Sequence, residues 1–572
     1  METIVEEILT RAVGELKRRG ELPGDFFPDV IIERPKREEF GDYGCPLPLA
    51  MAKAAHKSPK DCGNAILEVV DAPSDLFDAI TFAPPGFLNF KVNPRAWFMK
   101  LQDIAADPEG FGGSGAGRNQ RVLIEFVSAN PTGPLHVGHA RGAVLGDALA
   151  RIMSAAGYDV DTEYYINDVG NQMATLGRSL YARGRETLGL GHGDFPENGY
   201  LGDYIRELAA EFAHGEGRES LEKDYEDLGP VDDNPAVGFA SSRLLELIKD
   251  DLNALGVGFN QWFSERSLHD RGLVPLAVQS LLDSGRAYKD ASGAVLFRMD
   301  DDDEDDRVIV RGNGISTYFA SDIAYHHEKA GRGYARLINI WGSDHHGYIP
   351  RVKAAMAAMG HDPDMLEVLL VQMVTLTRGG EVVPMGKRSG RFVTLREVVD
   401  EVGPDAVRFI FLLRKADSQM EFDLDLAKSQ SMENPVYYVQ YGHARVASIL
   451  RKADAAGLMP APWSKDLGDV LSLPEERNMA KQLTRLPGVV ASSAIKREPH
   501  HLAFYLMDLV KGFHSYYTRY AHTDKVISDD AEKTAARLFL VSCVKAVLAR
   551  GLGMLGVGAP DEMHYGGDDE QG

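Results

Sequence analysis

The sequence predicts a multidomain α/β protein built around a parallel sheet, and three observations favour this class. The chain has 572 residues, which is enough for roughly three or four domains of ordinary size. A strand, loop, helix, strand pattern runs from Arg121 to Ile166, and such a unit requires parallel strands. Beyond about residue 425 the apolar spacing is helical almost to Gly556, which indicates an all-α C-terminal domain.

The first domain is expected over residues 1–110 as a small α+β unit. Apolar residues recur at helical spacing near the N-terminus, at Ile4, Ile8, Leu9, Ala12 and Leu16. The Gly-rich stretch from Asp107 to Gln120 then predicts a mobile linker. The charged start of the chain is unlike a signal peptide, and the sequence has no apolar run of about 18 residues that would predict a membrane helix.

The second domain is expected over residues 118–425. Arg121 to Val127 is a β-branched apolar run that predicts a strand, and Ala140 to Ala156 has a helical period. The Pro- and Gly-rich loop between them lies where parallel sheets bind nucleotides. Charged helical patterns between about residues 180 and 275 predict an insertion.

Charge and cysteine content exclude several classes of protein. Lys and Arg number 62 against 85 Asp and Glu, a net charge of −23, so capture of nucleic acid by overall positive charge is excluded and local basic patches are required. Cys45, Cys62 and Cys543 are too far apart for a CxxC zinc site and too few for a disulfide framework, which predicts a reducing cytoplasm. The acidic run 300–306 is interpreted as a solvated loop rather than a metal site.

The motif HVGH, His136 to His139, follows the predicted strand and enters the predicted helix. Free backbone N–H groups and the helix dipole would therefore face a bound phosphate. Gly138 lets a nucleotide approach the backbone, and the two histidines, three residues apart, can reach one phosphate. The alternative is a pair of ordinary surface histidines.

This motif belongs to a longer stretch, EFVSANPTGPLHVGHARGAVLGDALARIMSAAGYDV, which is followed by YYINDVGNQ. The stretch closely resembles the ATP-binding half of arginyl-tRNA synthetases, a class I family whose signature is HIGH. Similar resemblances lie in STYFASDIAYHHEK and IWGSDHHGYIPRVKAAM for its amino-acid site, and in VVPMGKRSGRFVTLREVVDEVGPDAVRF for its KMSKS region. NPVYYVQYGHARVASIL and GLGMLGVGAP resemble its anticodon-binding domain, and GDYGCPLPLAMAK resembles its first, tRNA-contacting domain.

The resemblance covers most of the chain from about Gly86 onward and implies a fold and a reaction. It implies a Rossmann-like catalytic core and a helical anticodon-binding domain at residues 426–572. The implied enzyme is an arginine–tRNA ligase, in which the arginine carboxylate attacks the α-phosphate of ATP, bound with Mg²⁺, to form arginyl-adenylate. Arginine is then transferred to the terminal ribose of tRNA. The implied partners are L-arginine, ATP and tRNA; a cytoplasmic monomer without membrane contact or bound zinc is expected.

A guanidinium is a planar fork of donors that demands carboxylate acceptors. Glu125 ends the predicted strand, while Tyr318 and Asp322, four residues apart, would share one helix face. The resemblance places Asn130 at the α-amino or carboxylate group of the substrate. The expected arginine-binding residues are Glu125, Ser128, Asn130, Tyr318, Asp322 and His345. The alternatives are that Glu125 is an ion-pair partner and that Tyr318 is a core aromatic residue.

The KMSKS-like segment departs from the family pattern, because Pro384 replaces the first lysine and Gly386 replaces the serine. Lys387 remains and would neutralise charge on the leaving pyrophosphate; the alternative is a solvated turn. The expected catalytic residues are His136, His139 and Lys387, and the expected ATP-binding residues also include Gly138, Asp344, His345 and Met385. A metal site at Asp344 to His346 is less favoured, because no further ligand pattern completes it.

The predicted C-terminal domain carries aromatic, polar and cationic residues suited to stacking on unpaired bases. The residues expected to bind tRNA are Tyr437, Gln440, Tyr441 and Arg445, with Tyr438 and His443 beside them. Half-buried packing is the alternative for individual tyrosines at helical spacing.

Two other classes of function stay open. One is a sister synthetase for another amino acid, or another nucleotidyl-transferring HxGH enzyme; whether arginine alone supports adenylate formation distinguishes it. The other is a catalytically silent tRNA-binding paralogue, which would bind tRNA without charging it.

Overall fold

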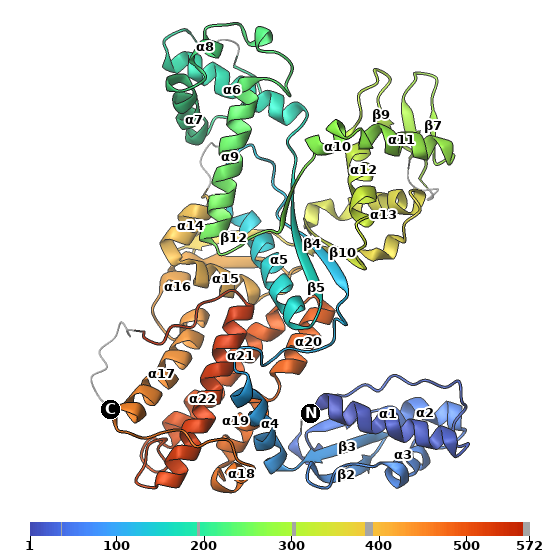
Figure 1. The fold of residues 1–572 in the computed structure, drawn as a ribbon, viewed down its shortest axis with the longest axis vertical. Helices are drawn as coiled ribbons and strands as arrows, with labels where there is room; N and C mark the ends of the chain where they lie inside the picture. Colours follow the sequence, from blue (N-terminus) through green and yellow to red (C-terminus); the bar gives the residue numbers. More distant parts are fainter. Residues whose placement is uncertain (36, 192–194, 300–304, 384–392, 564–572) are drawn as a thin grey trace.

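The computed structural model describes residues 1–35, 37–191, 195–299, 305–383 and 393–563. At its centre lies a parallel sheet in the order β11-β10-β4-β5-β6 (Figure 1). The strands are β4 (Arg121–Glu125), β5 (Asp159–Ile166), β6 (Gln261–Ser264), β10 (Arg336–Gly342) and β11 (Leu366–Val371). The predicted α/β class and parallel sheet are confirmed, and β4, the first strand of this sheet in chain order, lies in its middle.

The predicted strand, helix, strand unit is β4, α5 (Val137–Ala155) and β5. The Gly-rich stretch before β4 differs from the predicted mobile linker, because it packs against the end of α5. The Ser114 N–H donates to the Ala155 carbonyl at 3.0 Å, and the Gly117 N–H donates to Ala156 at 2.8 Å. A Cβ at Gly117 would lie 2.4 Å from the Tyr158 nitrogen. The glycines therefore permit close packing rather than mobility.

The predicted insertion is a helical lobe with its own apolar core. It contains α6 (Asn171–Thr187), α7 (Asp203–His214), α8 (Arg218–Leu221), η2 (Tyr225–Leu228) and α9 (Pro235–Ala254). The predicted limits, about 180 and 275, also enclose β6, which pairs with β5 in the central sheet. At four residues, β6 has too short an apolar pattern to stand out between charged helices.

A second lobe connects β6 to β10 around the antiparallel sheet β7-β8-β9. Its elements are α10 (Arg266–Asp270), α11 (Leu273–Asp283), β7 (Ala287–Lys289), β8 (Val295–Phe297), β9 (Arg307–Val310) and α12 (Tyr318–Ala330). Most of the acidic run, residues 300–304, lies outside the described residues. Within the described part of that run, the Asp306 carboxylate accepts a hydrogen bond from the Met299 N–H at 3.1 Å.

After β10 the chain completes the catalytic region with a small sheet of order β13-β12-β14. The elements are η3 (Ser343–Tyr348), α13 (Ile349–Ala358), η4 (Pro363–Met365), β12 (Val374–Arg378), β13 (Glu381–Val382), α14 (Leu395–Val402), α15 (Pro404–Leu412) and β14 (Met420–Asp423).

The N-terminal α+β unit is an antiparallel sheet, β1-β3-β2, covered by helices. It comprises α1 (Glu2–Arg18), η1 (Glu38–Phe40), β1 (Tyr43–Cys45), α2 (Leu47–Ala55), α3 (Pro59–Val69), β2 (Phe77–Ala83) and β3 (Phe87–Val92). Ile8, Leu9 and Leu16 of α1 are buried, as their spacing predicts. The next helix, α4 (Pro94–Ala106), packs instead against the C-terminal helices (Figure 1).

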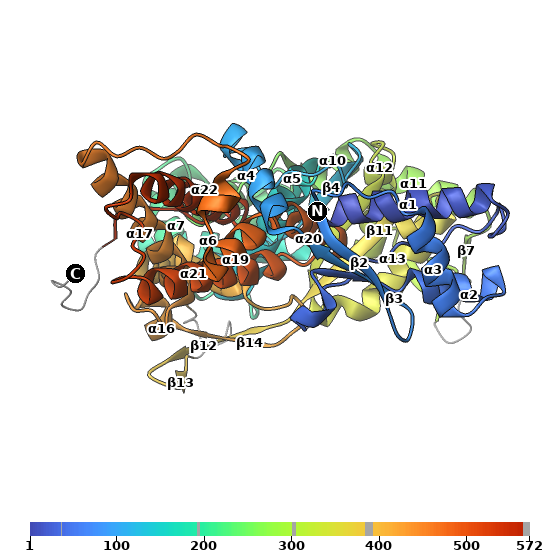
Figure 2. The same ribbon diagram turned by 90° about the horizontal axis from the view of Figure 1, so that it is seen from below.

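The C-terminal domain is helical, as predicted. It consists of α16 (Leu424–Lys428), α17 (Pro435–Ala455), α18 (Leu467–Val470), α19 (Pro474–Leu483), α20 (Leu486–Lys496), α21 (His500–Arg519) and α22 (Ala531–Met554). Figures 1 and 2 show the N-terminal unit beside these helices, and Lys481 of α19 forms an ion pair with Asp42 of that unit. In the described part of the chain, none of the helices combines the length and apolar character needed to span a bilayer.

A buried guanidinium joins three of these regions. Arg408 of α15 is fully buried and pairs with Asp147 of α5. Its Nε donates to the Leu555 carbonyl after α22 at 3.0 Å, and its Nη1 donates to the Leu255 carbonyl after α9 at 3.1 Å. One side chain of α15 thus connects α5, the end of α9 in the insertion, and the end of α22, the last helix of the chain.

We expect Arg408→Met to destabilise the protein by about 3–5 kcal/mol, because it removes the buried partner of Asp147 and leaves carbonyls without their donor. Arg151→Met is the matched control: Arg151 also pairs with Asp147, at 2.7 Å, but is 44% exposed, so we expect a loss below about 1 kcal/mol. Urea unfolding followed by tryptophan fluorescence measures both. Equal losses of unfolding free energy in the two variants would show that the burial of Arg408 makes no additional contribution to stability.

Candidate active site

The central sheet has a topological switch point between β4 and β10. From β4 the chain continues to β5 on one side, whereas β10 lies on the other side and continues to β11. Ligands of such sheets bind in the crevice at the carboxyl ends of the strands beside this point. The residues that follow β4 and β10 are therefore the candidate site.

The loop after β4 has an unusual backbone. Val127 and Ser128 have φ values of +68° and +41°, a region that costs free energy for residues with a Cβ and most for a β-branched one. The Ser128 hydroxyl holds this turn by accepting from the Tyr165 N–H at 3.1 Å and donating to Glu125 Oε1 at 3.2 Å. Such strain is concentrated at functional sites.

His136 and His139 cap the N-terminus of α5 reciprocally. The Gly138 N–H donates to Nδ1 of His136 at 3.1 Å, and the His136 N–H donates to Nδ1 of His139 at 3.2 Å. The two rings are stacked with centroids 3.8 Å apart. Because each Nδ1 accepts, the proton of each neutral ring resides on Nε2. A Cβ on Gly138 would lie 2.9 Å from the His136 ring, so the glycine is required by the cap itself.

Glu125 lies in a buried ion pair, the alternative that the sequence left open. Lys329 is fully buried and its Nζ lies 2.5 Å from Glu125 Oε2. Burial alone would raise the pKa of Glu125, but the charges of Lys329 and His326 and the hydrogen bonds from Lys329 and Tyr325 together outweigh it and hold that pKa below its ordinary value. Tyr325, on the same helix as Lys329, approaches Glu125 Oε2 at 3.0 Å and donates to Glu163 at 2.6 Å.

Asp322 has the opposite balance. Burial, together with the nearby charges of Glu265 and Glu125, raises the pKa of this carboxyl group to about 7, although a hydrogen bond from Tyr348 opposes the rise. Burial likewise raises the pKa of Glu265, which is 2% exposed. In the described chain, neither Asp322 nor Glu265 contacts a lysine or an arginine. Two buried carboxyl groups thus lie close together with no lysine or arginine beside them in the described chain; His269 Nε2 lies 3.9 Å from Glu265 Oε1.

Two further predicted arginine-binding residues lie at the start of α12 and on the loop after β4. Tyr318 begins α12, one turn before Asp322, as predicted; it is 51% exposed and its hydroxyl faces Gly170. The Asn130 amide donates to Gln172 Oε1 at 2.8 Å. The half-exposed Tyr318 is not the core aromatic residue that was its alternative.

Asp344 and His345 lie in η3, directly after β10 and next to β4, with side chains 82% and 63% exposed. Met385 and Lys387 lie outside the described residues. The chain that follows them returns to the motif: Thr394 forms a bridge with His136, and the Leu395 N–H donates to the Leu135 carbonyl at 2.7 Å.

The predicted tRNA-binding residues of α17 divide into two groups. Tyr437 and Gln440 are buried, and the Gln440 amide donates to Asp405 and to the Gly558 carbonyl, so packing within the domain accounts for them. Arg445 is partly exposed and stacks on Tyr441 at 4.9 Å. His443 is buried and hydrogen-bonds the Pro560 carbonyl.

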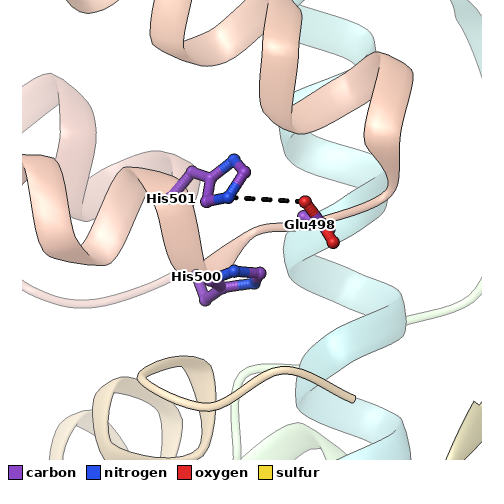
Figure 3. Close-up of side chains that lie close together, drawn as sticks. All are labelled: Glu498, His500 and His501. Carbon is purple, nitrogen blue, oxygen red and sulfur yellow. Dashed lines mark ion pairs between the residues drawn. The ribbon is translucent and has the colours of Figure 1, made fainter. Parts of the chain in front are cut away.

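A second cluster of ligand-type side chains lies away from the sheet, at the turn between α20 and α21. Glu498, His500 and His501 bring their ligand atoms within 4.8 Å of one another (Figure 3). Glu498 already pairs with His501 at 3.4 Å and with Lys415 at 3.4 Å. The ammonium group and the N-terminus of α21 both oppose a bound cation, so we interpret the cluster as an ion-pair network.

Comparison with known proteins agrees with this arrangement. Three family models match in succession: an arginyl tRNA synthetase N terminal domain over residues 2–92, a tRNA synthetases class I (R) catalytic domain over residues 101–424, and a DALR anticodon binding domain over residues 439–563. The chain belongs to the arginyl-tRNA synthetase family. It therefore carries the class I catalytic domain of an aminoacyl-tRNA ligase.

Members of the arginyl-tRNA synthetase family align over nearly the whole chain. Arginine–tRNA ligase of Syntrophotalea carbinolica is 46% identical over 95% of this chain and 96% of its own. That of Desulfosudis oleivorans is 46% identical over 98% of this chain and all of its own. The arginyl-tRNA synthetase structure of Thermus thermophilus is 25% identical, with a TM-score of 0.75 over 98% of this chain and 99% of that one.

Within this arginyl-tRNA synthetase architecture, the site contains residues that the sequence did not single out. Glu265, which lies just after β6, adds a second buried acid that contacts no lysine or arginine in the described chain, and Lys329 neutralises Glu125. Tyr348 donates to Asp322 from η3. The position of Glu265 at the carboxyl end of a sheet strand is a signal that could have identified it, but only once β6 itself had been assigned.

We expect Lys329→Met to destabilise the enzyme by about 3–5 kcal/mol, because it leaves the Glu125 carboxylate buried without its cation. Adding Glu125→Gln should recover most of that loss, since the second substitution removes the uncompensated charge. Thermal and urea unfolding of both variants and the wild type measure this. A double variant no more stable than Lys329→Met would contradict the pairing.

Proposed function

We propose that this chain ligates arginine to tRNA at the carboxyl edge of its parallel sheet, and that Asp322 and Glu265 bind the guanidinium of arginine. The observation that carries the proposal is the pair of buried acids, which no lysine or arginine of the described chain contacts and beside which only the His269 imidazole, 3.9 Å from Glu265, could carry positive charge. A guanidinium is always charged and offers donors to two carboxylates at once. Its positive charge would offset the burial and the repulsion by Glu265 and Glu125 that together raise the pKa of Asp322.

The other arginine contacts follow from the positions around that pair. Tyr318, which is half-exposed, supplies a polar aromatic wall, and Glu125, whose charge Lys329 balances, offers carboxylate oxygens as acceptors. Ser128 and Asn130, on the strained loop after β4, suit the α-amino and carboxylate end of arginine, with His345 approaching from β10. These assignments rest on placement at the switch point and on the resemblance of the motifs.

ATP would bind across the N-terminus of α5. His136, Gly138 and His139 present the helix dipole and two imidazoles to its phosphates, while Asp344, His345 and Met385 border the nucleotide. The arginine carboxylate attacks the α-phosphorus in line, and the bond to pyrophosphate breaks. His136, His139 and Lys387 stabilise the charge that develops on the phosphate oxygens. Mg²⁺ enters as part of the ATP substrate.

In the second step the terminal 2′-hydroxyl of tRNA attacks the carbonyl carbon of arginyl-adenylate, and AMP leaves. The DALR domain would bind the anticodon arm, and we favour Tyr441 and Arg445 over the buried Tyr437 and Gln440 for contacts to bases. We place the domain borders near 1–110, 118–425 and 426–572, with α4 docked on the helical domain. We further propose a monomer acting in the cytoplasm, which suits its three free, buried cysteines.

Arginine-dependent exchange of labelled pyrophosphate into ATP tests the whole proposal. We expect exchange with arginine and none with lysine or glutamate, because neither control carries a guanidinium. The assay is run with and without total tRNA, since the family resemblance implies that activation waits for tRNA. Exchange without tRNA would remove that dependence and keep the ligase. Tight tRNA binding with no exchange under either condition would contradict the proposal and indicate a silent paralogue.

The pKa of Asp322 makes arginine binding dependent on pH. The ionised carboxylate of Asp322 binds the guanidinium. Below about pH 7 this carboxyl group must lose its proton before arginine binds, so the KM for arginine should rise as pH falls, by up to about tenfold per pH unit. Above pH 7 the KM should be constant. Asp322→Asn should raise the KM and flatten its pH profile between pH 5.5 and 8.5. An unchanged slope in that variant would exclude Asp322 as the titrating group.

A further inference from the structure

Arg141 is a buried cation that the mechanism above does not use. It lies on α5, two residues after His139, and is 2% exposed. Its Nη1 donates to the Gln372 carbonyl at 2.9 Å and its Nη2 donates to the Lys415 carbonyl at 2.8 Å. In the described chain no carboxylate contacts it. Burying a charge against neutral groups costs free energy, so this position needs a reason beyond packing.

The two carbonyls belong to two different connections. Gln372 joins β11 to β12, and Lys415 joins α15 to β14. The connections also bond to each other, because the Gln372 N–H donates to the Ala416 carbonyl at 3.0 Å. β12 and β14 then pair in parallel, starting at Val374 opposite Met420. Arg141 therefore fastens the starting edge of the β13-β12-β14 sheet to the helix that carries HVGH.

The same sheet leads into the KMSKS-like region. β12 and β13 directly precede residues 384–392, and where the described chain resumes, Thr394 and Leu395 bond to His136 and Leu135. The Gln372 side chain also accepts from Ser343 at 3.1 Å, beside Asp344. The described chain is thus anchored beside HVGH on both sides of residues 384–392: before them through Arg141 of α5, and after them through Thr394 and Leu395.

An arginine is required for this geometry. A planar guanidinium can donate to two carbonyls from adjacent nitrogens in a fixed orientation, whereas a lysine ammonium is a point donor on a flexible stem. A lysine at position 141 would keep the positive charge but could not donate to the Gln372 and Lys415 carbonyls in the same fixed orientation.

We propose that Arg141 is a positioning residue for arginine activation: by holding the Gln372 and Lys415 connections against α5, it aligns the β12–β14 sheet with HVGH. The inference rests on the proposed function and adds a residue that touches no substrate. It acts on the rate constant of the chemical step, because a displacement of about 1 Å between catalytic groups can cost about 100-fold in rate.

The test uses Arg141→Lys and Arg141→Met in the full-length enzyme, assayed by arginine-dependent pyrophosphate exchange with tRNA present. We expect kcat to fall by about 10- to 100-fold, while the KM for arginine stays within about twofold because its pocket is untouched. Arg151→Lys, on the same helix but 44% exposed, is the matched control and should leave kcat unchanged. Thermal unfolding confirms that each variant is folded; Arg141→Lys serves if Arg141→Met does not fold.

A double-mutant cycle with Lys387→Ala separates positioning from general damage. If Arg141 acts through the sheet that precedes Lys387, then Arg141→Lys should cost much less in the Lys387→Ala background than in the wild type. Equal losses in both backgrounds, an unchanged kcat, or a rise in the KM for arginine instead of a fall in kcat would each overturn the inference. Failure of the proposed function is a separate outcome, because it appears as absent exchange in the wild type.

Discussion

The arrangement of the molecule depends on the buried guanidinium of Arg408. The helix that carries HVGH, the lobe inserted after β5 and the last helix of the chain meet at this side chain through Asp147, Leu255 and Leu555. Arginine suits the junction because it satisfies several acceptors from different directions while remaining charged in the protein interior. The ends of α9 and α22, which are far apart in the sequence, thereby share the Arg408 guanidinium as a hydrogen-bond donor. The same side chain sets the position of α5, the helix on which the candidate site is built, relative to them.

The charges inside the catalytic region are of two kinds. Glu125 and Glu163 are neutralised within the protein, by Lys329 and Arg332 respectively, and such pairs hold β4 and β5 to α12 and to the loop after it. Asp322 and Glu265 have no such lysine or arginine partner in the described chain, and only the His269 imidazole lies within ion-pair distance of Glu265. A protein tolerates buried acids of this kind when a ligand supplies the missing charge. Selectivity for a cationic amino acid then follows from the distribution of charge rather than from shape alone.

The sequence predicted those parts of the fold and site whose signals are local. The β4–α5–β5 unit, the N-terminal helix and the helical C-terminal domain each carry a regular apolar period, and HVGH lies where the loop meets the helix. Features that depend on contacts between distant segments were not predictable in this way. The tight packing of Gly117 needs the end of α5 beside it, and the pairing of Glu125 needs Lys329, 204 residues away. Gln440 has the side chain of a base-contacting residue, but its amide donates to Asp405 and to the Gly558 carbonyl, which lie 35 and 118 residues away in the sequence.

In the reciprocal cap on α5, the two nitrogens of each imidazole have different functions. Nδ1 accepts a hydrogen bond from a backbone N–H group at the start of the helix, and Nε2 carries the proton of the neutral ring and points away from the helix. A shorter amide such as asparagine can imitate Nδ1, and a longer one such as glutamine can imitate Nε2. The architectural and chemical contributions of these histidines can thus be separated by amide isosteres, which alanine replacement, removing both edges together, cannot do.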